Sequence, residues 1–135
     1  MPFFTWNASF SVGVKEMDAQ HQKLVEMINR LHDAMRSGKG SQELGPILYE
    51  LVDYSTFHFS AEEKLLTTHG YPALLTQKGE HDGFTKKVKG YREQYQQGKM
   101  VLSIEVLNFL KDWLAHHIQV EDKKYGSYLN GKGIS

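Results

Sequence analysis

The sequence of 135 residues contains no cysteine, only three prolines and no excess charge of either sign. Without cysteine, the chain has no disulfide framework, no thiolate zinc site, no cysteine-ligated iron–sulfur cluster and no thiol nucleophile. The 16 basic and 16 acidic side chains cancel, which argues against a nucleic-acid partner and against a polybasic membrane-surface protein. No apolar run is long enough to cross a membrane, and the N-terminal residues do not resemble a signal peptide. These absences predict a soluble, cytoplasmic protein.

Glycine and proline clusters divide the chain into four long segments behind an irregular N-terminal arm. The arm spans 1–17, and the segments span 18–37, 41–68, 72–97 and 101–129. Each segment repeats apolar residues at intervals of three and four, which is typical of helices; Val106, Phe109, Trp113 and Val120 form this stripe in the last one. Short connectors between long helices imply antiparallel neighbours. The sequence therefore predicts an all-α, up-down-up-down four-helix bundle that forms one domain over residues 1–135.

Polar side chains interrupt the apolar stripe of every predicted helix. In chain order they are His21, then His58 and Glu62, then Gln77 and His81, and finally His117. Counted from the connectors at a rise of ~1.5 Å per residue, all of them fall within a layer about one or two helical turns thick. Buried imidazoles and carboxylates need partners or a metal ion. Their common level predicts a metal site inside the bundle.

The chemistry of these side chains narrows the choice of metal. Imidazole and carboxylate without thiolate suit iron, manganese or zinc, and two carboxylates among several histidines suit a pair of ions. The second carboxylate is Asp122, five residues after His117. At ~100° per residue, this spacing turns Asp122 about 140° away from His117 on a regular α-helix. If both reach one centre, the last helix should carry a π-bulge or another local distortion, and such bulges are common at functional sites.

These residues, in this order and at these separations, resemble the hemerythrin family, specifically the bacterial hemerythrins. The matching motifs are His21, His58-Phe-Ser-Ala-Glu62, His81 and His117-Ile-Gln-Val-Glu-Asp122, with the Gly70-Tyr71-Pro72 turn and the stretch from Trp113 to Ile118. The similarity covers essentially the whole chain.

The resemblance implies a pair of non-haem iron ions bridged by Glu62, Asp122 and an oxo or hydroxo group. It implies that His21 and His58 hold the iron that binds O2, and that His81 and His117 hold the other iron. It also implies an apolar O2 pocket, whose lining would be Trp113, Leu114 and Ile118, together with Phe59. The expected partners are O2 and small anions such as azide, with no nucleic acid and no membrane, and a parent chemotaxis or signalling protein is compatible with the sequence.

One position departs from the family pattern. The third histidine of the second iron is replaced by Gln77. An amide oxygen is a weaker ligand of iron than imidazole, and a glutamine can also turn away and leave water bound. We therefore expect weaker metal retention at that iron and an oxygenated state that decays faster to the ferric state. A natural divergent member and a deliberately altered ligand variant both fit the sequence, and the close match around position 77 favours the altered variant.

The leading hypothesis is an O2-binding di-iron protein for oxygen transport, storage or sensing, rather than an enzyme. The alternative is a di-iron peroxidase or oxidase that uses the extra open coordination position beside Gln77. A metal-free structural bundle is a third interpretation. The remaining histidines, His32, His69 and His116, are expected outside the site, and Glu63 is interpreted as a solvated charge.

Overall fold

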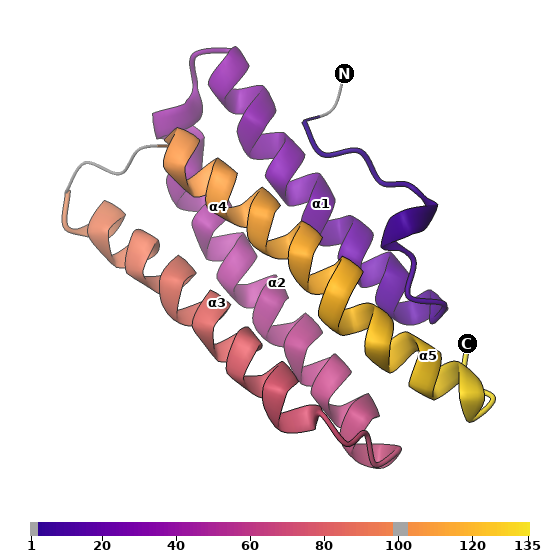
Figure 1. Ribbon diagram of the computed structural model, residues 1–135. Coiled ribbons are helices and arrows are strands. Elements are labelled where there is room, and N and C mark those ends of the chain that lie inside the picture. The colour runs from indigo at the N-terminus through magenta and orange to yellow at the C-terminus, as the bar shows by residue number, and fades with distance from the viewer. Residues whose placement is uncertain (1–2, 99–102) are drawn as a thin grey trace.

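The computed structural model describes residues 3–98 and 103–135, and in this part of the chain the regular elements are all helices, without strands. In chain order the elements are η1 (Ala8–Phe10), α1 (Lys15–Arg36), α2 (Gly40–Thr68), α3 (Leu74–Gln96), α4 (Ser103–His116), η2 (His117–Asp122) and α5 (Lys123–Gly131). Because α4, η2 and α5 follow one another without a break, they form one rod. Figure 1 shows this rod beside α1, α2 and α3, with successive rods running in opposite directions. The all-α, up-down-up-down bundle predicted from the sequence is confirmed.

The helix bounds differ from the expected ones mainly at the start of the chain. α1 begins at Lys15, ahead of the expected residue 18, and Glu16 and Asp18 in its first turn favour a helix N-terminus. α2 ends at Thr68, as expected, and α3 begins at Leu74 rather than residue 72. The expected start of the last helix, residue 101, lies outside the described residues.

Glycines end the rods at the predicted connectors. Gly38 follows α1 with φ 74°, and Gly70 follows α2 with φ 67°. This left-handed conformation costs glycine little and lets the chain turn back on the last carbonyls of the helix. After α1, for example, the Lys39 amide donates to the Ala34 carbonyl at 2.7 Å. The reversals place consecutive helices side by side.

The N-terminal arm is irregular apart from the short 3-10 turn η1, but it is fastened to the bundle. Asp18 accepts hydrogen bonds from the Ser11 hydroxyl at 2.6 Å and from the Val12 amide at 2.8 Å. A Cβ at Gly126 in α5 would lie 2.0 Å from the Val12 carbonyl oxygen, so this close approach requires glycine. The arm therefore packs across α1 and α5, where Phe10 and Val12 are buried.

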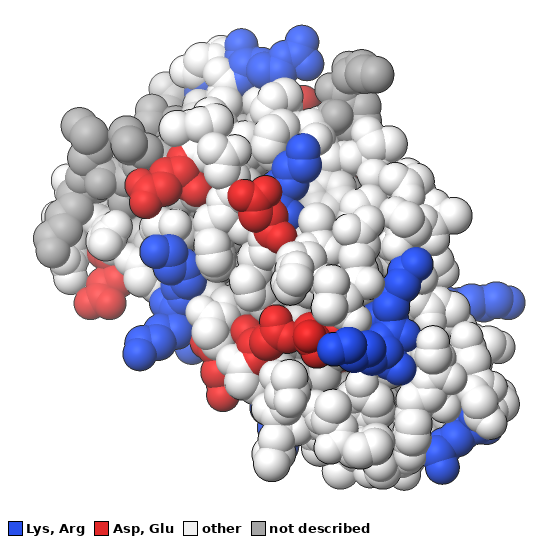
Figure 2. Space-filling view, in the orientation of Figure 1, with Lys and Arg blue, Asp and Glu red and all other residues white. Residues whose placement is uncertain are grey.

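Apolar side chains from all four rods fill the centre of the bundle. They form one buried cluster, with residues Leu24, Ile28 and Leu31 from α1, Leu44, Leu48 and Leu51 from α2, Phe84 and Val88 from α3, and Val106, Leu107 and Leu110 from α4. On the face seen in Figure 2, basic and acidic side chains are interspersed. Within the described residues, no helix is both long and apolar enough to cross a membrane.

The last rod widens into a π-helix at η2, as the five-residue spacing of His117 and Asp122 predicts. Both side chains are buried in the bundle. The same distortion corrects one detail of the apolar stripe. Val120 was expected in the core, but its side chain is 38% exposed, because the wider turn changes the phase of the helix.

Candidate metal centre

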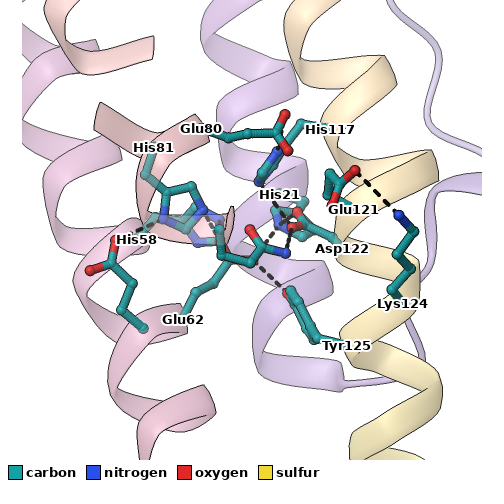
Figure 3. Close-up of polar contacts among 12 residues, drawn as sticks. His21, His58, Glu62, Glu80, His81, His117, Glu121, Asp122, Lys124 and Tyr125 are labelled. Carbon is teal, nitrogen blue, oxygen red and sulfur yellow. Dashed lines mark hydrogen bonds and ion pairs between the residues drawn. The ribbon is translucent and has the colours of Figure 1, made fainter. Parts of the chain in front are cut away.

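Six buried side chains converge in the middle of the bundle, and each rod contributes at least one. They are His21 from α1, His58 and Glu62 from α2, His81 from α3, and His117 and Asp122 from η2. They form two groups that share Glu62: one with His21 and His58, the other with His81, His117 and Asp122. Within each group, one ligand atom per residue lies within 4.8 Å of all the others. Figure 3 shows the side chains pointing toward one another.

The two carboxylates each reach histidines of more than one helix. Glu62 Oε2 lies 3.0 Å from His21 Nε2, and Glu62 Oε1 lies 3.2 Å from both His58 Nε2 and His81 Nε2. Asp122 Oδ2 lies 3.1 Å from His21 Nε2, and Asp122 Oδ1 lies 3.0 Å from His117 Nε2. A carboxylate placed between two sets of histidines is suited to bridge two cations.

Several of these close atoms do not form hydrogen bonds with one another. Glu62 Oε1, Asp122 Oδ2, and the Nε2 atoms of His81 and His117 are buried without a hydrogen-bond partner among the described residues. Their distances are short, but their angles are not those of hydrogen bonds, which leaves lone pairs directed into the cluster. Such groups cost about 1–3 kcal/mol each when left unsatisfied. Imidazole nitrogens and carboxylate oxygens arranged in this way fit a pair of iron ions.

The acidic and basic groups of the cluster shift one another's pKa strongly. Burial lowers the pKa of His21, but hydrogen bonds and charge attraction from Asp122 and Glu62 outweigh it and raise the pKa to about 10. Burial raises the pKa of Glu62, yet the positive charge of His58 and hydrogen bonds with the histidines hold that pKa well below its usual range. The pKa of Asp122 is lowered in the same way by His117 and His21, against burial and the charge of Glu62. Both carboxylates are therefore anionic, as a cation site requires.

A second layer of polar side chains lies close to the Nδ1 atoms of three of the histidines and forms hydrogen bonds with two of them. Gln20 Oε1 lies 2.6 Å from His58 Nδ1, and Glu63 Oε2 lies 2.8 Å from His81 Nδ1. Glu80 Oε1 lies farther away, 3.5 Å from His117 Nδ1. The contacts of Gln20 and Glu63 fix the ring orientations of His58 and His81 and leave their Nε2 atoms facing the cluster, whereas His117 Nδ1 makes no hydrogen bond within the described residues.

The interpretation of Glu63 as a solvated charge is wrong. Its side chain is 26% exposed and binds His81 across the α2–α3 interface. Gln20 and Glu80 were not identified from the sequence. Each of the three stands next to a cluster residue in the chain and contacts a histidine of another rod. A polar residue adjacent to a ligand was the signal that could have found them.

Tyr125 is a further residue that the sequence reasoning missed. Its side chain is fully buried in α5, and its hydroxyl donates to Glu62 Oε2 at 2.5 Å. Burial and the negative charges of Glu62 and Asp122 raise its pKa well above the usual value, so the phenol stays protonated. Its position three residues after Asp122, on the same face of the helix, was the available signal.

Gln77 reaches the cluster from α3, one turn before His81. Its Nε2 donates to Asp122 Oδ1 at 3.0 Å, while its Oε1 is buried without a hydrogen-bond partner among the described residues. The side chain thus occupies the position that the sequence pattern assigned to it. Its nitrogen, rather than its oxygen, faces the carboxylate.

Of the four residues expected to line an O2 pocket, two stack on the histidines from α3 and η2, and the other two are buried in the core. Phe59 stacks on His81 with ring centroids 4.0 Å apart, and Trp113 stacks on His117 at 4.4 Å. Leu114 and Ile118 are buried. Together they place an apolar wall beside the cluster.

The other three histidines lie outside the cluster. His32 stacks on Phe3 with ring centroids 4.7 Å apart, and His116 is exposed. His69 follows the end of α2, where its carbonyl accepts a hydrogen bond from the Tyr128 hydroxyl at 2.7 Å.

Fold and cluster together define a four-helix-bundle protein with a buried cation site. The family described as "Hemerythrin HHE cation binding domain" matches residues 12–129. The chain therefore belongs to the hemerythrin family, and it is a non-haem di-iron protein that binds O2.

Named relatives and a solved structure agree with this assignment. The chain is 35% identical over 129 residues to the bacteriohemerythrin of Stenotrophomonas maltophilia, covering 96% of the chain and 83% of that protein. It is 37% identical over 125 residues to the bacteriohemerythrin of Pseudomonas aeruginosa, covering 93% and 80%. The crystal structure of wild-type hemerythrin superposes with a TM-score of 0.86 at 32% identity, covering 93% of this chain and 96% of that one. None of these three proteins is named as a peroxidase or an oxidase.

Proposed function

We propose that His21 and His58 hold one iron, that His81 and His117 hold the other, and that Glu62 and Asp122 bridge them. We call these the first and the second iron site. The observation that carries this division is the position of the two carboxylates. Glu62 contacts histidines of both sites, and Asp122 contacts His21 of the first and His117 of the second.

The side chains around the cluster form an apolar environment that suits binding of a small apolar molecule. When bound, a pair of ferrous ions supplies two electrons and an open coordination position for O2. Phe59, Leu114 and Ile118 keep water away from the histidines, since all three are buried and apolar. Tyr125 donates to Glu62 and holds that carboxylate between the two sites.

Gln77 makes the second iron site the weaker one. Its amide nitrogen donates to Asp122 Oδ1, and turning the amide over would bring two oxygens of partial negative charge together. This orientation keeps the amide oxygen away from Asp122 and leaves the second site with two imidazoles. The expected consequences are weaker retention of the second iron and faster decay of the oxygenated protein to the ferric state.

The physiological role that fits best is oxygen transport, storage or sensing in the cytoplasm, either alone or as part of a chemotaxis or signalling protein. A buried apolar wall and histidines held from two sides suit binding of O2 without further substrates. Small anions such as azide are expected to compete for the same coordination position.

Two measurements test this function. The reconstituted protein should hold two irons per chain, and reduced protein exposed to O2 should gain a visible absorption that reverses when O2 is removed. Azide added to the ferric protein should change the same spectral region.

A matched pair of variants gives the control. His117→Ala removes a proposed ligand, whereas His116→Ala removes the neighbouring exposed histidine. Only the first should lower the iron content. A protein that binds no iron, or whose spectrum does not respond to O2, would contradict the proposal.

A further inference from the structure

The second iron site differs from the first in the charge of the side chains that contact the Nδ1 atoms of its histidines. His81 Nδ1 meets the carboxylate of Glu63 at 2.8 Å, and His117 Nδ1 lies 3.5 Å from the carboxylate of Glu80. In the first site, His58 Nδ1 meets the neutral amide of Gln20 at 2.6 Å. His21 Nδ1 has no hydrogen-bond partner within 3–98 and 103–135. Carboxylates therefore lie next to the Nδ1 atoms of the second site, whereas none contacts the Nδ1 atoms of the first site within the described residues.

The negative charges of Glu63 and Glu80 are not neutralised by basic side chains in the described part of the chain. In the described part of the chain, neither Glu63 nor Glu80 forms an ion pair with a lysine or arginine, although both side chains are partly exposed, at 26% and 29%. Glu121, which lies in η2 next to Asp122, is instead paired with Lys124 at 3.4 Å (Figure 3). Within the described residues, the carboxylates of Glu63 and Glu80 form ion pairs with imidazoles alone.

The same two histidines are also held by aromatic stacking. Phe59 lies nearly parallel to His81, with 7° between the ring planes, and Trp113 lies at 16° to His117. His21 and His58 meet each other edge to face, with centroids 4.6 Å apart, as His81 and His117 do at 5.1 Å, but within the described residues neither His21 nor His58 stacks parallel to an aromatic ring. Aromatic stacking therefore restricts the second pair of rings more than the first.

The carboxylates thus support the site that lacks an imidazole. We infer that Glu63, with a smaller contribution from Glu80, is a positioning residue that compensates for Gln77 by strengthening the two remaining imidazole ligands of the second site. A carboxylate that accepts the Nδ1 proton makes the opposite nitrogen a better electron donor and fixes its direction. The inference rests on the proposed function, since it takes the six cluster residues as ligands.

Isosteric substitutions isolate the charge. In Glu63→Gln, an amide oxygen still accepts from His81 Nδ1, but the negative charge is gone. Cobalt(II) serves as a spectroscopic probe, and its removal by excess EDTA is followed through its visible absorption. We expect one of the two cobalt ions to leave roughly 10- to 100-fold faster than in the unmodified chain, with the other unchanged.

Two further variants set the scale of this effect. Glu80→Gln should have the same effect on the same ion but smaller, because Glu80 is farther from its histidine and makes no hydrogen bond to it. Glu121→Gln is the matched control, because its carboxylate stands next to a ligand in the chain but contacts Lys124. It should release both ions at the unmodified rate.

Restoring the third imidazole tests compensation itself. In a Gln77→His background, Glu63→Gln should accelerate cobalt release far less than it does in the presence of Gln77. A merely structural role of Glu63 would give the same factor in both backgrounds and would lower the unfolding temperature of the metal-free protein, which we expect to stay unchanged.

The outcomes separate this inference from the proposed function. If the unmodified chain takes up fewer than two cobalt ions at saturating cobalt, both are overturned. If it takes up two, and Glu63→Gln releases both equally, releases neither faster, or acts equally in the two backgrounds, only the compensation is overturned.

Discussion

Gln77 Nε2 donates a hydrogen bond to Asp122 Oδ1 at 3.0 Å, which ties α3 to the π-helical turn η2 inside the cluster. The bond engages the nitrogen end of the amide with a proposed bridging ligand. We therefore expect Gln77 to support Asp122 rather than to act as a ligand itself.

Two substitutions at position 77 test this role. Gln77→His adds an imidazole and should slow EDTA extraction of the second metal by about tenfold or more, because imidazole is the stronger donor. Gln77→Leu removes the amide without supplying a ligand, and should change that rate by no more than about tenfold, the effect of one hydrogen bond worth up to about 1.5 kcal/mol. A much faster loss of one metal from Gln77→Leu would instead identify the amide as a ligand.

The buried hydroxyl of Tyr125 gives a second prediction. In Tyr125→Phe, Glu62 Oε2 keeps only its hydrogen bond with His21, so the metal-free protein should lose about 1–3 kcal/mol of unfolding free energy. The loss should be smaller in the metal-loaded protein, where the cations satisfy the carboxylate. Thermal unfolding with and without metal measures both values.

Tyr128→Phe is the matched control for Tyr125. Its hydroxyl donates to the backbone carbonyls of His69 and Gly70, at 2.7 and 3.2 Å, rather than to a residue of the cluster. Tyr128→Phe should lower the free energy of unfolding by the same amount with and without metal. Equal costs for Tyr125→Phe in the two states would show that its hydroxyl does not act through the cluster.

Metal uptake should release protons and strengthen as the pH rises. The pKa of His21 is raised from 6.5 to about 10 in the metal-free protein, and the pKa of His117 is also raised. The charged form of His21 therefore stabilises the metal-free fold fully below about pH 6.5, and this stabilisation is lost as the pH rises through about 10. A metal ion must displace that proton.

At pH 8, binding should release close to one proton from His21, and the apparent affinity should grow up to about tenfold per pH unit until the pH approaches 10. Calorimetry in buffers of different ionisation enthalpy measures the number of protons released. Uptake at pH 8 without proton release would contradict the raised pKa of His21.

Much of the site could be predicted because each helix repeats at a known angle. The breaks in the apolar stripes located His21, His58, Glu62, Gln77, His81 and His117 at one level, and the structure brings them together. The spacing of His117 and Asp122 even predicted the π-helical turn. These inferences need only the geometry of a single helix.

The contacts between helices could not be predicted in the same way. Glu63 and Glu80 point away from their own helix's stripe, and their roles depend on which histidine the neighbouring rod presents. Val120 was placed in the core because the apolar repeat was continued through η2 at the α-helical angle. Sequence periodicity describes a helix in isolation, whereas these residues are defined by the packing of one rod on another.

The π-helical turn itself can be tested by changing its length. Deleting the exposed Val120 reduces the His117–Asp122 spacing to four residues, which places both side chains on one face of an ordinary α-helix. The turn should then relax to an α-helix, keep Asp122 and Tyr125 in the cluster, and retain two metal ions per chain. Inserting an alanine after Val120 should rotate both residues out of the bundle and abolish uptake. Metal content and circular dichroism of the two variants measure this, and a deletion variant that folds but binds no metal would show that the site needs the wider turn.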